Sequence, residues 1–242
     1  MTEGNVAGGP PTEGTNAELG RLRQLAREMG ESSLAMVHAG WQAFRAGDLE
    51  LAQKVLDLDT QLDRYDQEIE HQVIRYLVTQ RPSAGDLRAA AALLKVTTHL
   101  DRIGRLGFDI AMITTPVDGH DPPALVDLLS TMDEKVESMV NQALEALVRG
   151  DAASAKQLFV RDDDVDRMHR SATRLCIREL VHHPMSAGRL SGELLVARHF
   201  ERIADNACKI AERTIYAATG ERRAEYLPRH PSRPYALEPE PK

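Results

Sequence analysis

Aromatic residues and cysteines are scarce in this chain. Phe, Trp and Tyr together make up 4% of its 242 residues, so a hydrophobic core has to be built mainly from aliphatic side chains. The two cysteines, Cys176 and Cys208, lie inside predicted helices without the C-x-x-C spacing of a metal site. We interpret them as free thiols of a protein from a reducing compartment.

Long apolar runs and an excess of positive charge are also missing. No run approaches the ~20 apolar residues that a membrane-spanning helix needs, and the N-terminus lacks the basic-then-apolar pattern of a signal peptide. The net charge of −7 disfavours a nucleic-acid-binding protein, whose affinity depends on Lys and Arg contacts to phosphates. We therefore expect a cytoplasmic protein that reaches a membrane only through its partners.

Sequence motifs typical of enzymes are absent as well. The chain has no glycine-rich phosphate loop, no serine nucleophile elbow and no pattern around a nucleophilic cysteine. These absences predict a protein that works by binding and not by catalysis.

Helical periodicity, by contrast, covers most of the chain. Apolar residues recur at three- and four-residue steps, which predicts six helices that begin near Ala17 and end near Thr219. The expected boundaries are Gly47–Asp48 and Gly150–Asp151, where a left-handed glycine precedes an N-cap, and Ser83 with Asp86, a capping box. The fifth helix is expected to run without a break from Asp151 to about His182. No segment alternates with period 2, so the fold class is all-α.

The six helices form an internal duplication. Residues 47–87 and 150–190 align without a gap at fourteen identities in forty-one positions, where chance would give roughly two to four. The sequence therefore predicts two tandem three-helix bundles. The expected organisation is a disordered arm over 1–16, a first repeat over 17–117, a second repeat over 118–220 and a disordered tail over 221–242.

Each repeat carries a pair of carboxylates one helical turn apart. The pairs are Asp59 with Asp63 and Asp162 with Asp166, and the last helix of each repeat adds Asp101, or Glu201 with Asp205. If neighbouring helices bring these groups together, the negative charge requires protons, basic residues or a cation to offset it. Oxygen ligands suit hard ions such as Mg²⁺, Mn²⁺, Ca²⁺ or ferric iron.

Two other interpretations of these residues stay open. Acid pairs at this spacing occur on many solvated helix faces, and the recurring arginines Arg64, Arg102, Arg167 and Arg202 could neutralise them without a metal. His99 and His199 adjoin the acidic positions, but such residues are more often interfacial or exposed than metal ligands.

The chain resembles the PhoU family of phosphate-signalling regulators. The resemblance covers about 17–220 and is carried by an acidic D-x-x-x-D helix followed by an [ED]-R-I-x-[DR] helix, twice over. The matching segments are LDLDTQLDRYDQEIE, PSAGDLRAAAALLKVTTHLDRIGRLGFDIA, VRDDDVDRMHR and ARHFERIADNACKIAER.

The resemblance implies a cytosolic, non-enzymatic helical protein. Such a protein keeps the phosphate regulon off when phosphate is abundant, as an adaptor between the ATPase subunit of the phosphate ABC transporter and the phosphate sensor histidine kinase. We expect a homodimer. The alternative is a chaperone-like or structural helical bundle that serves another membrane system.

The resemblance also implies metal sites for iron or another divalent cation such as Mg, Mn or Zn. Carried onto this chain, the second site is complete, with Asp162, Asp166, Glu201 and Asp205. The first site has Asp59, Asp63 and Asp101, but Arg105 stands where the family usually has Asp. Because a guanidinium beside three carboxylates competes with a cation, we predict a complete metal site only in the second repeat.

Overall fold

All regular structure in the described part of the chain is helical. The computed structural model describes residues 13–115 and 122–222, except for the side chains of 13–16 and 57. Residues 1–12 of the expected arm, 116–121 of the expected connecting loop and 223–242 of the expected tail lie outside the described residues.

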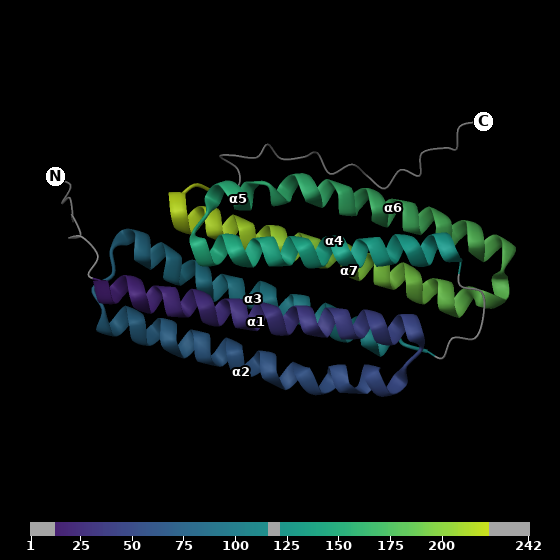
Figure 1. Ribbon diagram of the computed structural model, residues 1–242, viewed down its shortest axis with the longest axis horizontal. Helices are drawn as coiled ribbons and strands as arrows, with labels where there is room; N and C mark the ends of the chain where they lie inside the picture. The colour runs from purple at the N-terminus through teal and green to yellow at the C-terminus, as the bar shows by residue number, and fades with distance from the viewer. Residues whose placement is uncertain (1–12, 116–121, 223–242) are drawn as a thin grey trace, which may run out of the picture.

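The helices form two units that lie side by side along their length (Figure 1). The first unit contains α1 (Glu13–Ala46), α2 (Leu49–Thr79) and α3 (Ala84–Met112). The second contains α4 (Pro123–Arg149), α5 (Ala152–Lys156), α6 (Leu158–His182), the 3₁₀ helix η1 (Pro184–Ser186) and α7 (Ala187–Thr219). The α2–α3 turn and the α6–α7 turn lie at opposite ends of the molecule.

The helix boundaries of the two units follow the repeated sequence signals. Gly47 and Gly150 adopt left-handed backbone angles, with φ of 66° and 65°. Asp48 and Asp151 each accept two hydrogen bonds from the first turn of the next helix. Ser83 caps α3 in the predicted capping box.

Two expected helix bounds were wrong. Helix α1 begins at Glu13, before the predicted start near Ala17, and the continuous fifth helix is divided at Gln157 into α5 and α6. At this break the carbonyl of Ser154 accepts hydrogen bonds from the Gln157 N–H and the Gln142 side chain. In a continuous helix that carbonyl would bond the N–H of Leu158, so the competing donors explain the break.

The start of α7 also departs from its counterpart in the first unit. Ser186 repeats Ser83 in the sequence, but its side chain caps no helix. The acceptor Asp86 of the first capping box is replaced by Arg189, which has no acceptor atom. Arg189 instead donates to the carbonyl of Phe44 in α1, at 2.8 Å.

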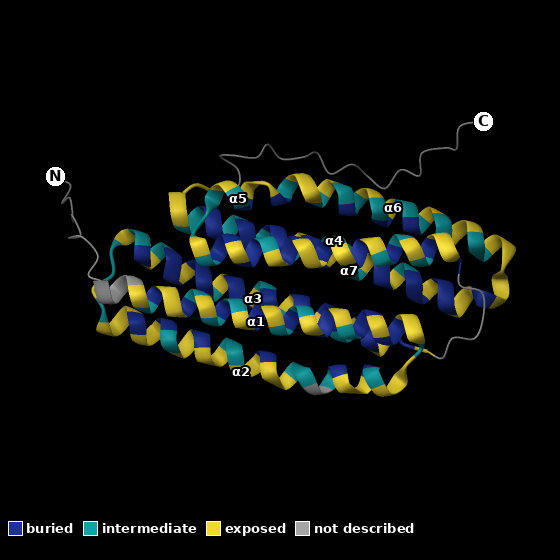
Figure 2. Cartoon of the chain, in the orientation of Figure 1, coloured by how far each residue is buried: buried dark blue, intermediate teal, exposed yellow. Residues whose placement is uncertain are grey.

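The hydrophobic core runs through both units without interruption. Helices α1 and α3 of the first unit pack against α4 and α7 of the second, while α2 and α6 lie on the outside. Figure 2 shows the buried faces of the inner helices turned toward one another. At the junction Trp41 stacks on Phe44 and meets the edge of Phe200 from α7, with ring centroids 6.2 and 5.7 Å away.

Across the described ranges, none of the helices combines the length and hydropathy required to span a bilayer.

Candidate functional site

The structure brings the predicted acidic residues of each unit together across a pair of helices. In the first acidic cluster, Asp59 and Asp63 on α2 face Asp101 on α3 through a shared contact with Arg105. In the second acidic cluster, burial and the surrounding carboxylates raise the pKa of Asp162 on α6. Two of those carboxylates, Glu201 and Asp205, belong to α7. The clusters occupy equivalent places in the duplicated units.

One guanidinium spans the whole first acidic cluster. Arg105 Nε donates to both carboxylate oxygens of Asp101, at 3.1 and 3.0 Å. Its Nη2 lies 3.4 Å from Asp63 Oδ1, and its Nη1 lies 3.7 Å from Asp59 Oδ2. The hydrogen bond to Asp101 is the largest cause of a raised pKa for Arg105, and the charges of Asp59 and Asp63 raise it further. The cluster therefore holds an internal counter-ion, and the residues do not fit a metal ion.

The second acidic cluster has Asp205 where the first has Arg105. The pKa of Asp162 is raised to about 7, first by burial and then by the carboxylates of Asp205, Asp166, Asp163 and Glu201, in that order of effect. The site thus concentrates negative charge in partly buried surroundings.

Glu201 is a mostly buried acceptor of the second cluster. Burial raises its pKa to about 6, against the lowering effect of Arg198. Arg198 Nη1 donates to Oε1 at 2.7 Å, whereas Oε2 is buried and accepts no hydrogen bond from the described residues. A buried oxygen of this kind has capacity for one further ligand, and a hard cation fits its chemistry.

The side chains have not closed into a coordination shell. Within the described ranges, no three His, Cys, Asp or Glu side chains are arranged so that they could hold a metal ion. The second cluster therefore concentrates oxygen donors and negative charge, and its described side chains form no coordination shell.

The two histidines beside the acidic positions face the junction of the units. His99 Nδ1 lies 3.1 Å from Asn206 Oδ1, so α3 contacts α7 here. Burial is the main cause of the lowered pKa of His99 and of His199. This placement agrees with the interfacial interpretation of His99.

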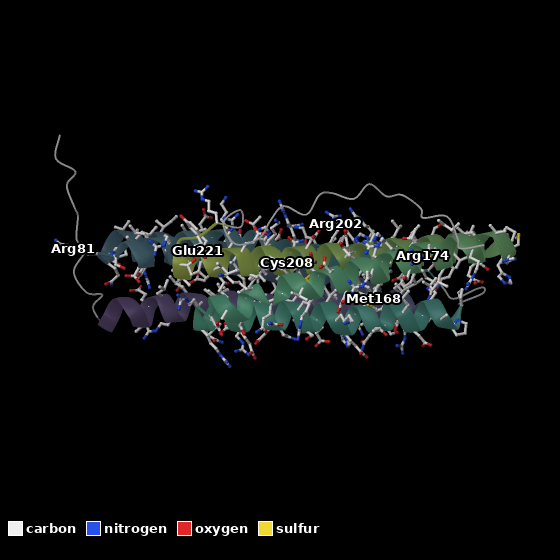
Figure 3. All side chains as sticks on the ribbon, turned by 90° about the horizontal axis from the view of Figure 1, so that it is seen from above. Arg81, Met168, Arg174, Arg202, Cys208 and Glu221 are labelled. Carbon is white, nitrogen blue, oxygen red and sulfur yellow. The ribbon has the colours of Figure 1, made fainter. Side chains whose placement is uncertain are left out.

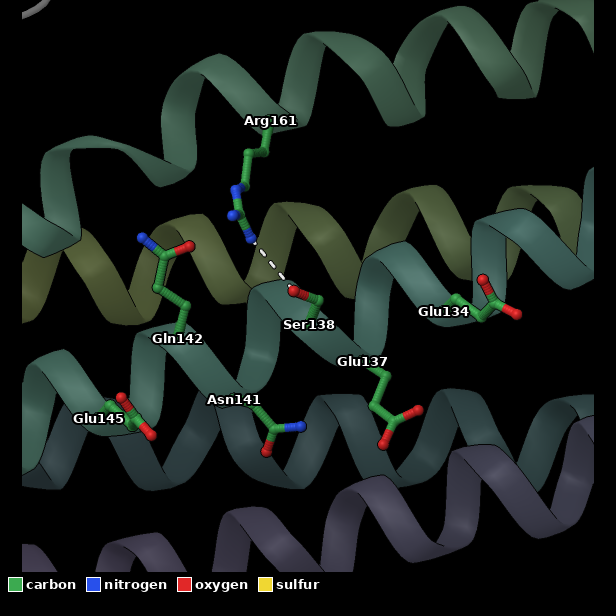
Figure 4. Close-up of a pocket in the computed structure, with 7 residues that line it drawn as sticks. All are labelled: Glu134, Glu137, Ser138, Asn141, Gln142, Glu145 and Arg161. Carbon is green, nitrogen blue, oxygen red and sulfur yellow. Dashed lines mark hydrogen bonds between the residues drawn. The ribbon is translucent and has the colours of Figure 1, made fainter.

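An open polar hollow of about 600 Å³ lies between α4 and α6 (Figure 4). In its lining, Arg161 of α6 points to α4 and donates to Ser138 Oγ at 3.1 Å. The other lining residues are Glu134, Glu137, Asn141, Gln142 and Glu145. This lining holds no histidine, cysteine or lysine, and it gives no arrangement of a nucleophile with its base.

Sequence reasoning missed Arg198 and the pair of His38 with Asp133. His38 of α1 approaches the buried Asp133 of α4, with Nδ1 and Oδ2 at 3.9 Å. The pair of His38 with Asp133 depends on the packing of α1 against α4, and its signal in the sequence was an acid at Asp133 within the apolar stripe of α4. The signal for Arg198 was its i,i+3 spacing from Glu201 on the same helix.

The chain matches the family described as "PhoU domain" over residues 26–114 and 129–214. It is 31% identical over 207 residues to the phosphate-specific transport system accessory protein PhoU homolog of Pseudomonas aeruginosa, covering 85% of each chain. It is 29% identical to the homolog of the same name from Clostridium acetobutylicum, covering 84% of this chain and 94% of that one.

Solved structures share the architecture. The crystal structure of PhoU from Pseudomonas aeruginosa superposes with a TM-score of 0.77 at 29% identity, covering 85% of this chain and 99% of that one. The phosphate transport system regulatory protein PhoU from Streptococcus pneumoniae superposes with a TM-score of 0.78 at 23% identity, covering 86% and 98%. The second likeness concerns the fold alone.

Proposed function

Because this chain belongs to the PhoU family, we propose that it is a cytoplasmic regulator of phosphate uptake and phosphate signalling. In this proposal it is a negative regulator of the phosphate regulon and links the phosphate ABC transporter to the sensor histidine kinase. The observation that carries the proposal is the match of both repeats to the family, together with relatives named as accessory proteins of a phosphate-specific transport system.

We propose that the protein acts by binding and performs no catalysis. The lining of the hollow between α4 and α6 offers polar side chains without a nucleophile–base pair. Two long helical units on a shared core supply extended faces for protein partners instead. The expected homodimer stays a prediction, which light scattering in solution can check.

The metal proposal is confined to the second acidic cluster. Asp162, Asp166, Glu201 and Asp205 would hold a hard divalent cation or iron, which would neutralise their mutual repulsion and join α6 to α7. Metal analysis of protein purified with and without oxygen tests this. We expect one cation per chain, and loss of that cation in Asp162→Ala/Asp166→Ala.

The regulatory proposal is tested by a phosphate-starvation reporter in a strain that lacks this protein. In abundant phosphate the reporter should come on, and the wild-type chain should silence it again. A reporter that stays off would contradict the proposal and would favour a helical bundle that serves another membrane system.

A further inference from the structure

The C-terminal half of α6 exposes apolar side chains on the outside of the molecule. The exposed fractions are 46% for Ile177, 74% for Val181 and 96% for Met185, which lies in η1. Ile177 and Val181 lie one turn apart near the C-terminus of α6, and Met185 follows in η1, between α6 and α7. Figure 1 shows the α6–α7 turn at one end of the bundle. Apolar side chains that are exposed together add no buried area to the core, so they indicate a contact surface.

The duplication shows that two of these exposed apolar residues are kept in both units. Ile177 and Val181 correspond to Ile74 and Val78 of α2, which are also exposed, at 53% and 79%. Two buried residues of α2 have changed, since Val73 and Tyr76 correspond to Cys176 and Glu179 of α6, whereas Leu77 is kept as Leu180. A helix retained only for packing would show the opposite, with fixed core positions and variable surface positions.

Only the α6 copy of this surface is strongly basic. Arg170, Arg174 and Arg178 lie beside the apolar residues, where α2 has Gln67, His71 and Arg75. The basic residue of α2 forms an ion pair with Glu18 of α1, at 3.5 Å.

The three arginines of α6 are exposed, and two of them form ion pairs at the surface. Arg170 Nη1 lies 4.0 Å from Asp166 Oδ2, Arg178 Nη2 lies 3.3 Å from Glu179 Oε1, and Arg174 donates to Ser171 Oγ. Figure 3 places Arg174 toward the α6–α7 end of the molecule, far from Glu221. An occupant of this surface therefore needs negative charge around an apolar centre.

We propose that this surface binds an apolar groove on a protein partner. Asp and Glu side chains of the partner would border that groove and meet the arginines. The surface comprises Arg170, Arg174, Ile177, Arg178, Val181 and Met185, and we name it the α6 docking face. The inference rests on the proposed function, which supplies the transporter ATPase subunit and the sensor kinase as the proteins to test.

A compact protein groove fits the surface better than an anionic bilayer does. Asp164 and Asp166 precede the arginines on the same helix, and Asp166 lies about 12 Å along the helix axis from Arg174. The whole chain carries a net charge of −7. Asp166 also forms an ion pair with Arg170. A flat anionic surface that reached Arg170 would therefore come within the ~8 Å screening length of a carboxylate.

The test measures Kd for the purified ATPase subunit and for the cytoplasmic part of the kinase. The variants are Val181→Glu/Met185→Glu and Arg174→Glu/Arg178→Glu. The matched controls are Val78→Glu at the equivalent position of α2 and Val160→Glu near the start of α6, both also at exposed positions. Circular dichroism and thermal unfolding confirm that each variant is folded.

We expect both α6 double variants to bind one of the two proteins at least about tenfold more weakly, with the controls within about twofold of wild type. If wild type binds one of the proteins and neither double variant weakens that binding, the inference is overturned and the proposed function stays in place. Equal weakening by Val78→Glu would also overturn it, because the charge difference between the two helices would then be irrelevant.

Two further outcomes are decisive. Vesicles of phosphatidylglycerol and phosphatidylcholine serve as the probe for a bilayer. If the double variants lose vesicle binding and keep protein binding, the occupant is a membrane and the inference is wrong. If wild type binds neither protein, the adaptor proposal fails and the inference fails with it.

Discussion

Arg105 and Asp205 occupy equivalent positions in the two units and create opposite electrostatics. The guanidinium of Arg105 contacts three carboxylates of the first acidic cluster. In the second cluster, the carboxylate of Asp205 is among the charges that raise the pKa of Asp162 to about 7. One residue therefore separates a cluster that carries its own counter-ion from one that concentrates negative charge.

Replacing Arg105 with Asp should create a second cation site. The variant removes the counter-ion from Asp59, Asp63 and Asp101 and supplies a fourth carboxylate. Calorimetric titration with Mn²⁺ should then rise from one to two ions per chain. Arg105→Lys is the matched control and should stay at one, because it keeps a positive charge. A stoichiometry unchanged by Arg105→Asp would contradict this account of the first cluster.

Asp133 makes a pH-dependent contribution to stability at the contact between α1 and α4. Burial is the main cause that raises its pKa to about 6. The folded state thus favours the protonated form, and stability falls as pH rises from about 4 to 6. Asp133→Asn should stabilise the protein at pH 8 by about 1–2 kcal/mol, discounted for solvent screening, and should have little effect below pH 4.

Thermal unfolding across this pH range measures the effect. Asp127→Asn, at an exposed position of the same helix, is the control and should leave the pH profile unchanged. Destabilisation by Asp133→Asn at pH 8 would show that the contact with His38 outweighs the burial of the carboxylate.

At the residue scale, the sequence predicted the positions of side chains that are set by the spacing within one helix and by the duplication. The positions of the acidic pairs follow from helical spacing and from the duplication. The same alignment places the basic residue Arg105 opposite Asp205, among the carboxylates of the first cluster. The contact of Arg198 with Glu201 could have been anticipated from its i,i+3 spacing, but the burial that orphans Glu201 Oε2 could not. Burial of that atom depends on the packing of neighbouring helices.

At the element scale, α1 and α3 approach each other at two glycines. A Cβ built on Gly40 would lie 2.3 Å from the carbonyl oxygen of Gly107, and one built on Gly107 would lie 2.5 Å from the backbone nitrogen of Val37. Helical periodicity placed both glycines on apolar stripes. It could not show that backbone meets backbone there, because that depends on the distance between the two helices.

Gly107→Ala should therefore destabilise the protein by about 3 kcal/mol, because the backbone of α1 has to move. Gly20→Ala is the matched control, since its Cβ would meet nothing within 4 Å. Removing a helix-interior glycine there should stabilise by about 0.5–1 kcal/mol. Chemical denaturation measures both, and equal effects of the two substitutions would contradict the close packing of α1 on α3.

At the scale of the whole molecule, the two predicted bundles share one core. The duplication predicted two three-helix units, and the relatives of known structure have the same architecture. The shared core follows from Trp41, Phe44 and Phe200 at the junction, which the sequence did not assign to an interface. Periodicity shows which face of a helix is apolar, but not which of several apolar faces it meets.

We propose that this molecule links a phosphate transporter to a sensor kinase by binding both proteins. The most direct test mixes the full-length chain with the purified ATPase subunit and the cytoplasmic part of the kinase, and measures the mass of the complexes by size-exclusion chromatography with light scattering. The account predicts a complex that contains all three proteins and forms only when this chain is present. Binding of neither protein, or of each only when the other is absent, would contradict it.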